Sequence, residues 1–201
     1  MSYEKRRQVR SVPTKFTTRA DENGSPYIEG YFVVFDDTYI ITDWMSESIA
    51  SGAFDKTLDN DIRALLNHNA DVVLGRNKAG TLELRVDEKG LWCKIYINAE
   101  DTQAMDVYRR VQRGDINQCS FGFDILDEEP IQKPDGSVHW LVKEVYLYEV
   151  SVCTFPAYEE TDIVARSKQR DKLIAERIET RKKHIKEVIH GFKSADAEKE
   201  D

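Results

Sequence analysis

A succession of short strand-like segments constrains this chain more than any other feature. The segments are rich in aromatic and β-branched residues, and turn-forming residues separate them. They are Tyr27–Phe35, Ile62–Leu66, Thr81–Val86, Leu91–Ile97, Ile116–Leu126 and His139–Phe155. Many short strands with few helices predict a mainly β fold with helices (α+β). The expected architecture is a closed or nearly closed antiparallel β-barrel, because closure removes exposed strand edges.

Two helices and one hairpin are predicted inside this strand-rich region. Ser51–Leu58 fits a short helix, since Phe54 and Leu58 lie four residues apart and share one face. A second helix is expected between an N-cap at Asp101 and a C-terminal glycine at Gly114. The turn-forming residues 87–90 predict that the strands on either side of them pair as a hairpin.

Composition divides the chain into three parts. Residues 1–26 are polar and are interpreted as an N-terminal arm with one short strand at Val12–Thr18. Residues 27–166 hold the β domain. Residues 167–201 are predicted to form an amphipathic helix over Ser167–Phe192, followed by a charged tail. The apolar stripe of this helix is narrow and densely surrounded by charge, which favours a solvated helix used for self-association or recruitment to a partner.

Charge, hydropathy and cysteine usage exclude several classes of protein. The formal net charge of −8 argues against nucleic acid as a direct partner. No apolar run is long enough to span a bilayer, and the basic N-terminal residues lack the apolar stretch of a signal peptide. The three cysteines are scattered, and the four histidines form no metal-ligand pattern with them. A cytoplasmic protein without a membrane span is therefore expected.

Three local patterns carry side chains suited to hydrolysis, which needs a nucleophile, a base within hydrogen-bond reach and a group that orients the base. His68 follows an apolar strand, Ser120 lies between large apolar residues, and Glu149 lies inside a strongly apolar run. A buried glutamate must be paired or partly solvated, so Glu149 is the most informative of the three. Taken singly, each pattern also fits a structural role: a loop histidine, a strand serine beside a bulge, or a salt bridge.

Cys119 is a rival nucleophile because it precedes Ser120 directly. Successive side chains of a strand point to opposite faces, so only one of the two can face a given site. Local sequence leaves the choice between them open.

The three patterns, in this order, resemble the tailed-phage prohead (capsid-maturation) serine protease family. The resemblance covers about Tyr27 to Val164, and while each motif is weak alone, the ordered set is specific. The motifs are Gly30-Tyr31-Phe32, Ser51-Gly52-Ala53-Phe54, Asn67-His68-Asn69, Leu74-Gly75-Arg76, Gly80-Thr81-Leu82, Gly90-Leu91, Arg113-Gly114, Ser120-Phe121-Gly122-Phe123, Glu149-Val150-Ser151-Val152 and Thr154-Phe155-Pro156-Ala157.

This resemblance implies a catalytic set of Ser120 as nucleophile, His68 as general base and Glu149 as the group that orients the base. It also implies a fold similar to herpesvirus assemblin, a β-barrel ringed by helices. In the herpesvirus enzymes a second histidine completes the triad, whereas the matching strand here offers Glu149. A carboxylate can orient an imidazole and stabilise its charged form. If Glu149 is structural, Asp124 and Glu144 are the next carboxylates to consider.

The group that stabilises the oxyanion is not assigned by the resemblance. The herpesvirus enzymes use an arginine-bearing loop after the third strand, but this chain has Ala157 and Tyr158 there and no arginine before Arg166. A backbone N–H is therefore the expected donor.

The function implied by the resemblance is that of a serine endopeptidase. Its expected substrates are the scaffold, or the scaffold segment of the major capsid protein, and the chain itself. It is expected to act inside the assembling prohead in the host cytoplasm, with dimer formation left open. The resemblance implies no metal or organic cofactor. Three other interpretations remain: a non-enzymatic capsid-assembly or scaffold protein on the same barrel, a cysteine hydrolase using Cys119, and a β-barrel binding module in which His68 and Ser120 lie far apart.

Overall fold

The computed structural model describes residues 8–22 and 24–155, together with residues 172, 175, 176, 178–180, 182 and 183. The chain divides into two compact units, Met1–Glu159 and Glu160–Asp201, and each is described by itself. The described residues of the second unit are helical. Most of the helix expected over Ser167–Phe192, and the motif end Pro156-Ala157, lie outside the described residues. Within the described part, no helix is long and apolar enough to cross a membrane.

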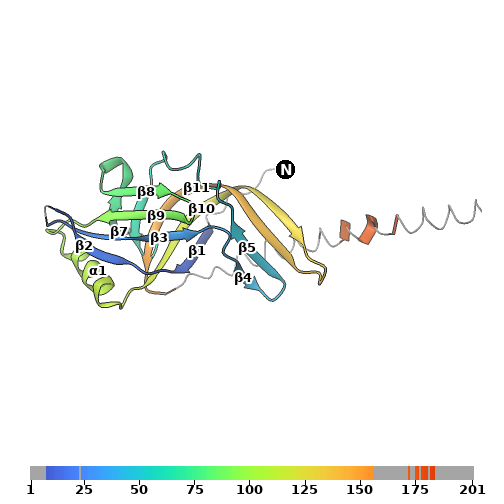
Figure 1. Cartoon of the computed structure of the whole chain (residues 1–201), viewed down its shortest axis with the longest axis horizontal. Helices are drawn as coiled ribbons and strands as arrows, with labels where there is room; N and C mark the ends of the chain where they lie inside the picture. The colour runs from blue at the N-terminus through green and yellow to red at the C-terminus, as the bar shows by residue number, and fades with distance from the viewer. Residues whose placement is uncertain are drawn as a thin grey trace, which may run out of the picture. The chain divides into compact units, whose positions relative to one another are not determined.

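The first unit is built mainly from strands arranged in two sheets (Figure 1). The seven-stranded sheet has the order β1-β10-β11-β5-β4, with β6 also paired to β11 and β7 paired to β6. Its strands are β1 (Gln8–Pro13), β4 (Tyr39–Thr42), β5 (Met45–Ile49), β6 (Arg63–Leu66), β7 (Asn69–Arg76), β10 (Gln118–Gln132) and β11 (Val138–Cys153). The four-stranded sheet has the order β2-β3-β9-β8, with β2 (Thr17–Ala20), β3 (Pro26–Val34), β8 (Leu82–Val86) and β9 (Gly90–Tyr96).

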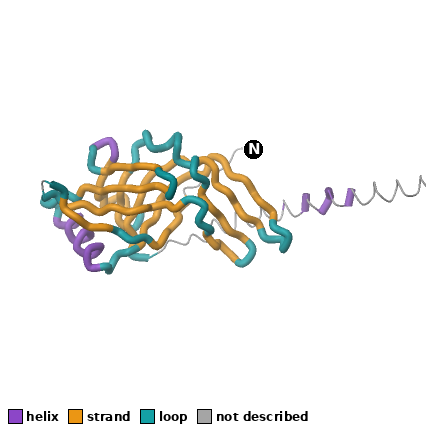
Figure 2. The backbone as a smooth tube through the Cα atoms, viewed as in Figure 1, coloured by secondary structure: helices purple, strands orange, loops and turns teal. Residues whose placement is uncertain are grey.

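The long hairpin of β10 and β11 organises the seven-stranded sheet. The two strands pair antiparallel from Gln118 opposite Cys153 to Gln132 opposite Val138. The first part of β11 also pairs in parallel with β5, and its last part pairs in parallel with β6. The tip of the hairpin and the β4–β5 hairpin extend together to one side of the packed body (Figures 1 and 2). The end of β11 thus lies between the serine-bearing strand β10 and β6, which leads into the histidine turn.

Apolar side chains of both sheets form one core. Phe121 and Phe123 stack on each other with ring centroids 4.7 Å apart, and Phe54 meets Phe121 edge-on. These rings are fully buried, as are Phe32 of β3 and Leu91 of β9. The residues on the Phe121 face of β10 therefore belong to the core, whereas the alternate residues face the other side of the sheet.

The predicted helix after β9 is confirmed together with both of its ends. Helix α1 spans Thr102–Arg113, and the Asp101 side chain accepts hydrogen bonds from the N–H groups of residues 103 and 104. Gly114 ends the helix in the left-handed conformation, with φ of 85°. The predicted hairpin is also confirmed as β8 and β9, which pair antiparallel.

The predicted helix over Ser51–Leu58 is wrong. This segment forms a run of turns in which the N–H groups of Ala53, Asp55 and Thr57 each bond the carbonyl three residues earlier. The Thr57 hydroxyl also accepts a hydrogen bond from the Leu147 N–H, at 2.7 Å, and Phe54 is fully buried. Tertiary contacts to β11 and the core therefore hold a chain path that a regular helix would not follow.

The mainly β fold with few helices is confirmed, but the described strands do not close into a barrel. The seven-stranded order ends at β1 and β4, and the four-stranded order ends at β2 and β8. Closure is one way to protect edges, and very short edge strands are another. Here β2 and β4 contain four residues each.

The segment interpreted as an N-terminal arm contributes two strands instead of the single strand predicted at Val12–Thr18. β1 ends at Pro13, and β2 begins at Thr17 in the other sheet. Proline has no backbone N–H for a ladder, which favours the end of a strand. The location of β1 is set by its pairing with β10, more than one hundred residues away in the chain. Local sequence carries no sign of such a pairing.

Candidate active site

A two-residue turn between β6 and β7 carries His68. Asn67 and His68 have φ values of 51° and 59°, as in the type I′ turn that joins tight hairpins. This turn favours Asn followed by Gly, and a histidine at the second position carries backbone strain of about 1–3 kcal/mol. A strained conformation at a side chain able to act as a base is typical of a functional site.

The end of β11 anchors this turn. The Asn67 N–H bonds the Val152 carbonyl at 3.0 Å, and the Asn67 side-chain oxygen accepts from the Thr154 N–H at 2.8 Å. The His68 N–H donates to the Ser151 hydroxyl at 3.2 Å. These hydrogen bonds join the turn to Ser151, Val152 and Thr154, and they therefore fix the position of the imidazole.

The His68 imidazole is held against a buried carboxylate. Its Nδ1 lies 2.6 Å from Glu149 Oε1, with the His68 side chain 20% exposed and the Glu149 side chain 2% exposed. A carboxylate can only accept, so Nδ1 carries the proton of this bond and Nε2 is left as an acceptor. The Ser151 hydroxyl donates to the second oxygen, Glu149 Oε2, at 2.6 Å. This arrangement can orient an imidazole and stabilise its charged form.

Ser120 lies on the same face of the sheet as Glu149. It is opposite Ser151 in the β10–β11 ladder, and Gly122, two residues further on, is opposite Glu149. Ser120 is fully buried, and its hydroxyl donates to the Arg10 carbonyl oxygen of β1 at 2.7 Å. The sheet thus brings Ser120 and Glu149 to one face, while the described residues show no hydrogen bond between Ser120 and His68.

Two cysteines border the site from different sides. Cys119 is fully buried on the core face, where its thiol contacts the carbonyls of Tyr31 and Phe32 at 3.4 and 3.6 Å. Cys153 lies beside the imidazole, with Sγ 3.8 Å from His68 Nε2. Burial and then the charge of Glu149 raise the pKa of the Cys153 thiol to about 12. The thiol therefore stays protonated near neutral pH and is a weak nucleophile.

The two carboxylates to be considered if Glu149 is structural, Asp124 and Glu144, form other contacts. Asp124 accepts a hydrogen bond from the Tyr148 hydroxyl at 2.6 Å, and Glu144 forms an ion pair with Lys56 at 2.7 Å. Of the three carboxylates considered from the sequence, Glu149 is the one in contact with His68. No group of three or more His, Cys, Asp or Glu side chains that could hold a metal ion occurs within the described ranges.

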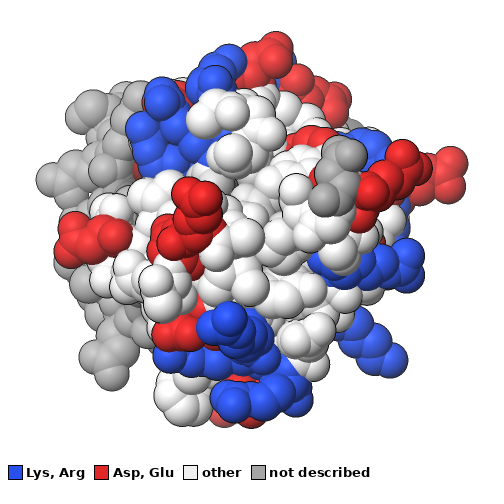
Figure 3. Space-filling view, turned by 90° about the vertical axis from the view of Figure 1, so that its left-hand side faces the viewer, with Lys and Arg blue, Asp and Glu red and all other residues white. Residues whose placement is uncertain are grey.

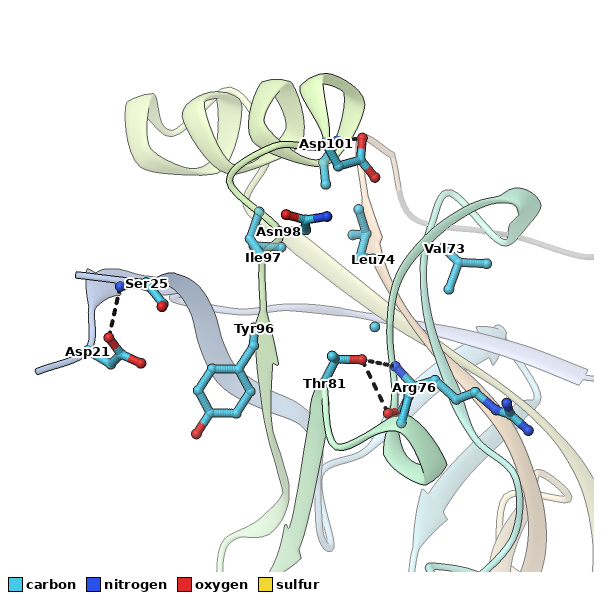
Figure 4. A pocket seen from close by; sticks show the side chains of 13 residues that line it. Asp21, Ser25, Val73, Leu74, Arg76, Thr81, Tyr96, Ile97, Asn98 and Asp101 are labelled. Atoms are coloured by element: carbon cyan, nitrogen blue, oxygen red, sulfur yellow. Dashed lines mark hydrogen bonds between the residues drawn. The ribbon is translucent and has the colours of Figure 1, made fainter. Parts of the chain in front are cut away.

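A pocket of about 440 Å³ lies near the start of α1 (Figure 4). Asp101 and Asn98 line one side, and Tyr96, Thr81 and Arg76 line the other. His68, Ser120 and Glu149 do not belong to its lining. The pocket is therefore separate from the histidine–carboxylate site.

Figure 3, which faces the end of the first unit that carries α1, shows acidic and basic side chains interspersed around an uncharged centre.

The sequence predicts no part in the site for Ser151 or Arg10. Arg10 belongs to the basic N-terminal arm, which is expected to be solvated, whereas the structure buries it. Ser151 belongs to the Glu149-Val150-Ser151-Val152 motif, and its spacing of two from Glu149 places both side chains on one face of a strand. Arg10 carries no comparable sign, because its contact with Ser120 depends on the pairing of β1 with β10.

Comparisons with known proteins show the family to which the chain belongs. The model of the Caudovirus prohead serine protease family matches residues 14–175. The curated prohead protease of Enterobacteria phage HK97 is 31% identical over 141 residues, which cover 68% of this chain and 58% of that relative. The chain therefore spans 58% of the length of this relative.

A solved structure supports the fold. The capsid assembly protease of bacteriophage T4 superposes with a TM-score of 0.50 at 10% sequence identity, covering 75% of this chain and 99% of that structure. At this identity the likeness concerns the fold alone. The family assignment rests on the family match, which extends over most of the chain and includes His68, Ser120 and Glu149. This chain belongs to the Caudovirus prohead serine protease family.

Proposed function

We propose that the chain is a serine endopeptidase of prohead maturation. The observation that carries the proposal is the His68–Glu149 pair, held on the sheet face that Ser120 shares, in a chain of this family. The proposed substrates are the major capsid protein with its scaffold segment and the chain itself. The proposed place of action is the assembling prohead in the host cytoplasm. The names of the HK97 and T4 proteins, a prohead protease and a capsid assembly protease, support this assignment.

In the proposed mechanism Ser120 attacks the carbonyl carbon of a peptide bond. His68 Nε2 takes the hydroxyl proton and passes it to the leaving amine, so the C–N bond breaks and an acyl-enzyme remains. Water then attacks the ester, again with His68 as base, and releases the carboxylate product. Glu149 keeps Nδ1 protonated and stabilises the imidazolium that forms in each half of the cycle.

One rearrangement is needed before this chemistry can begin. The Ser120 hydroxyl now donates to the Arg10 carbonyl oxygen, so its hydrogen must turn towards His68 Nε2. Rotation of the hydroxyl gives up this one hydrogen bond but leaves the backbone ladder in place, and catalytic hydrogen bonds often tighten only when substrate is bound. The observed bond therefore describes a resting state of the proposed enzyme.

The competing interpretations receive less support. A cysteine hydrolase using Cys119 requires that thiol to reach His68, whereas Cys119 lies on the core face with the aromatic rings. A binding module predicts that His68 and Ser120 are far apart, yet only strand β11 separates β10 from the histidine hairpin. A non-enzymatic assembly factor has no need of a strained histidine paired to a buried carboxylate.

The likeness to herpesvirus assemblin stays part of this proposal. The shared feature is a serine and a histidine positioned by strands on either side of a third strand that supplies the orienting group. The described strands form two sheets that do not close, so the proposed likeness concerns the site and not barrel closure.

The direct test of the function is co-expression with the capsid and scaffold proteins of the same phage. The proposal expects shortened capsid and scaffold products that are absent when the protease is omitted. The new termini, read by mass spectrometry, locate the scissile bonds. Uncut partners in assembled proheads that contain the correctly folded chain would favour the non-enzymatic assembly factor.

Glu149→Gln is expected to lower the cleavage rate by about 10³- to 10⁴-fold with little change in folding. The amide keeps the shape of the side chain but cannot stabilise the imidazolium or enforce the Nδ1–H tautomer. The measurement is kcat on a peptide substrate, with the melting temperature recorded in parallel. Glu144→Gln is the matched control, because it changes the same residue type on the same strand far from His68, where it pairs with Lys56. Equal rates in the two variants would make Glu149 a structural residue.

Ser151→Ala is expected to lower kcat by about 10- to 100-fold, an effect of the size seen when outer partners of a functional histidine are removed. Ser151 acts through its neighbours: it donates to Glu149 Oε2 and accepts from the His68 N–H. Loss of a buried partner also costs about 1–3 kcal/mol of unfolding free energy. Ser151→Thr keeps the hydroxyl and should recover most of the rate. A purely structural role would lower stability while leaving the kcat and pH profile of the folded enzyme unchanged.

A further inference from the structure

Strand β1 covers the nucleophile of the proposed enzyme. It is an edge strand that pairs antiparallel with β10, and its residue Ser11 is opposite Ser120. Without β1, β10 would itself be the edge of the sheet. The family match begins at residue 14, directly after the last residue of β1. The segment that occupies the edge beside Ser120 thus lies outside the matched region.

The backbone of β1 presents a peptide bond to Ser120. The Ser120 hydroxyl is 2.7 Å from the carbonyl oxygen of Arg10. The carbon of that carbonyl lies within about 3.9 Å of the hydroxyl oxygen, because a C=O bond is about 1.2 Å long. Reacting atoms in near-attack geometries are about 3–3.5 Å apart, so attack on the Arg10–Ser11 peptide bond requires the hydroxyl to move from the carbonyl oxygen towards the carbonyl carbon.

The Arg10 side chain is bound by a buried carboxylate. Its Nε lies 2.7 Å from Glu47 Oε1, and its Nη2 lies 3.1 Å from Glu47 Oε2. Glu47 is fully buried on β5, Arg10 is 9% exposed, and the guanidinium lies 5.7 Å from the ring centre of Phe123. A bidentate fork between guanidinium and carboxylate is the geometry by which proteins recognise arginine specifically.

These contacts are those expected of a substrate strand in a protease. An extended peptide that joins a sheet edge gains affinity from main-chain hydrogen bonds, and pockets for alternate side chains supply specificity. Here the carbonyl beside the nucleophile and the side chain in the buried site belong to the same residue, Arg10. In a bound substrate, the residue whose carbonyl faces the nucleophile is the one immediately before the scissile bond, conventionally called P1.

We propose that Glu47 determines specificity for a basic P1 residue, and that β1 occupies the substrate site with Arg10 in the P1 position. This inference rests on the proposed protease function. The substrate class it assigns is an extended peptide with arginine, or less favourably lysine, before the cleaved bond. Arginine is preferred because its planar fork matches both oxygens of Glu47, whereas lysine offers a point charge.

The chemistry at such a bond balances without a further reactant. Ser120 Oγ bonds to the carbonyl carbon of the basic residue, and the hydroxyl proton passes through His68 to the amine of the next residue as the C–N bond breaks. Water then hydrolyses the ester, frees the new C-terminal carboxylate and restores the hydroxyl of Ser120.

The test compares three peptides that differ only in P1, with arginine, lysine or glutamine at that position. The full chain is expected to cleave the arginine peptide with a kcat/KM at least about 100-fold above that of the glutamine peptide, because glutamine has no guanidinium for Glu47 to bind. The double variant Arg10→Gln/Glu47→Gln removes both charges together and so avoids an isolated buried charge. It is expected to cleave the two peptides at rates within a few-fold of each other. An unchanged preference in the double variant, or equal cleavage of all three peptides by the unmodified chain, overturns the inference.

A binding measurement separates this inference from the protease function itself. In the Ser120→Ala chain, calorimetric titration should show the arginine peptide binding at least about 10-fold more tightly than the glutamine peptide. Adding Arg10→Gln to that chain should strengthen binding of the arginine peptide, since β1 competes less well. Discrimination in binding without any cleavage by the unmodified chain would overturn the proposed function and keep the specificity site. Cleavage without discrimination between the two peptides would overturn the specificity site and keep the proposed protease function. A melting curve for each variant identifies loss of fold.

Discussion

Replacing Ser120 with alanine is expected to abolish cleavage of the capsid and scaffold partners while leaving the chain folded. The change removes the proposed nucleophile and, with it, one hydrogen bond to the Arg10 carbonyl, which contributes about 1 kcal/mol to stability. Loss of a nucleophile of this class lowers kcat by about 10⁶-fold, which is background in a cleavage assay. The measurement is the appearance of shortened partners on co-expression, together with kcat on a peptide and the melting temperature.

Two controls make this result specific. Ser137→Ala alters a serine in the turn between β10 and β11, where its hydroxyl bonds Asp135, and should leave cleavage unchanged. Turnover retained in purified Ser120→Ala would contradict the assignment. If that residual turnover disappeared on adding Cys153→Ala, the nucleophile would be the thiol that lies beside His68 Nε2.

Replacing His68 is expected to be nearly as damaging as replacing Ser120. The two residues act as one unit, so their losses do not add. The rate of the double variant Ser120→Ala/His68→Ala should therefore lie within a few-fold of the rate of the slower single variant. His68 has φ of 59°, a conformation that strains alanine but is tolerated by asparagine. His68→Asn therefore tests the loss of the base without the backbone strain.

The control for this prediction is another histidine of the same sheet. His139 lies between the Ser46 and Ser48 hydroxyls, 2.9 Å from each, and neither of these hydrogen bonds involves the catalytic set. His139→Gln is expected to leave kcat within a few-fold of the unmodified enzyme. A double variant of Ser120 and His68 that is orders of magnitude slower than either single variant would show that the two residues do not form one catalytic unit.

Local patterns predicted the elements whose stability is local. Helix α1 follows from its cap residues and apolar spacing, and the β8–β9 hairpin follows from two apolar strands around a turn. Strand β3, predicted over Tyr27–Phe35, forms over Pro26–Val34. The hydrogen bonds of α1 and of the β8–β9 hairpin join residues that are close in the sequence. Strand β3 is recognisable from its composition, although it pairs with β9, which is distant in the sequence.

Long-range pairing explains most of what could not be predicted. Strands β4 and β5 are short, and β5 carries Ser46, Glu47 and Ser48 among its buried residues, a composition that does not indicate a strand. Its place is set by parallel pairing with β11. Barrel closure could not be predicted for the same reason. The number of strands and the alternation of apolar residues do not determine whether the outermost strands pair with each other.

The site was predictable as a set of residue types and not as an arrangement. The sequence singled out His68, Ser120 and Glu149, and the structure places His68 against Glu149 and Ser120 on the same sheet face. Their catalytic roles stay predictions. The register that puts Ser120 opposite Ser151 depends on bulges in β10 and β11, which no local pattern specifies.

Covalent labelling tests the central claim, that Ser120 is a nucleophile activated by His68, most directly. The full chain is treated with a fluorophosphonate, digested and mapped by mass spectrometry. The expected result is one phosphonylated residue, Ser120, formed faster in Arg10→Gln, where β1 holds the site less firmly, and lost in His68→Asn. Any of three results would contradict the account: an adduct on a different residue, no adduct in either the unmodified chain or Arg10→Gln, or equal labelling of Ser120 with and without His68.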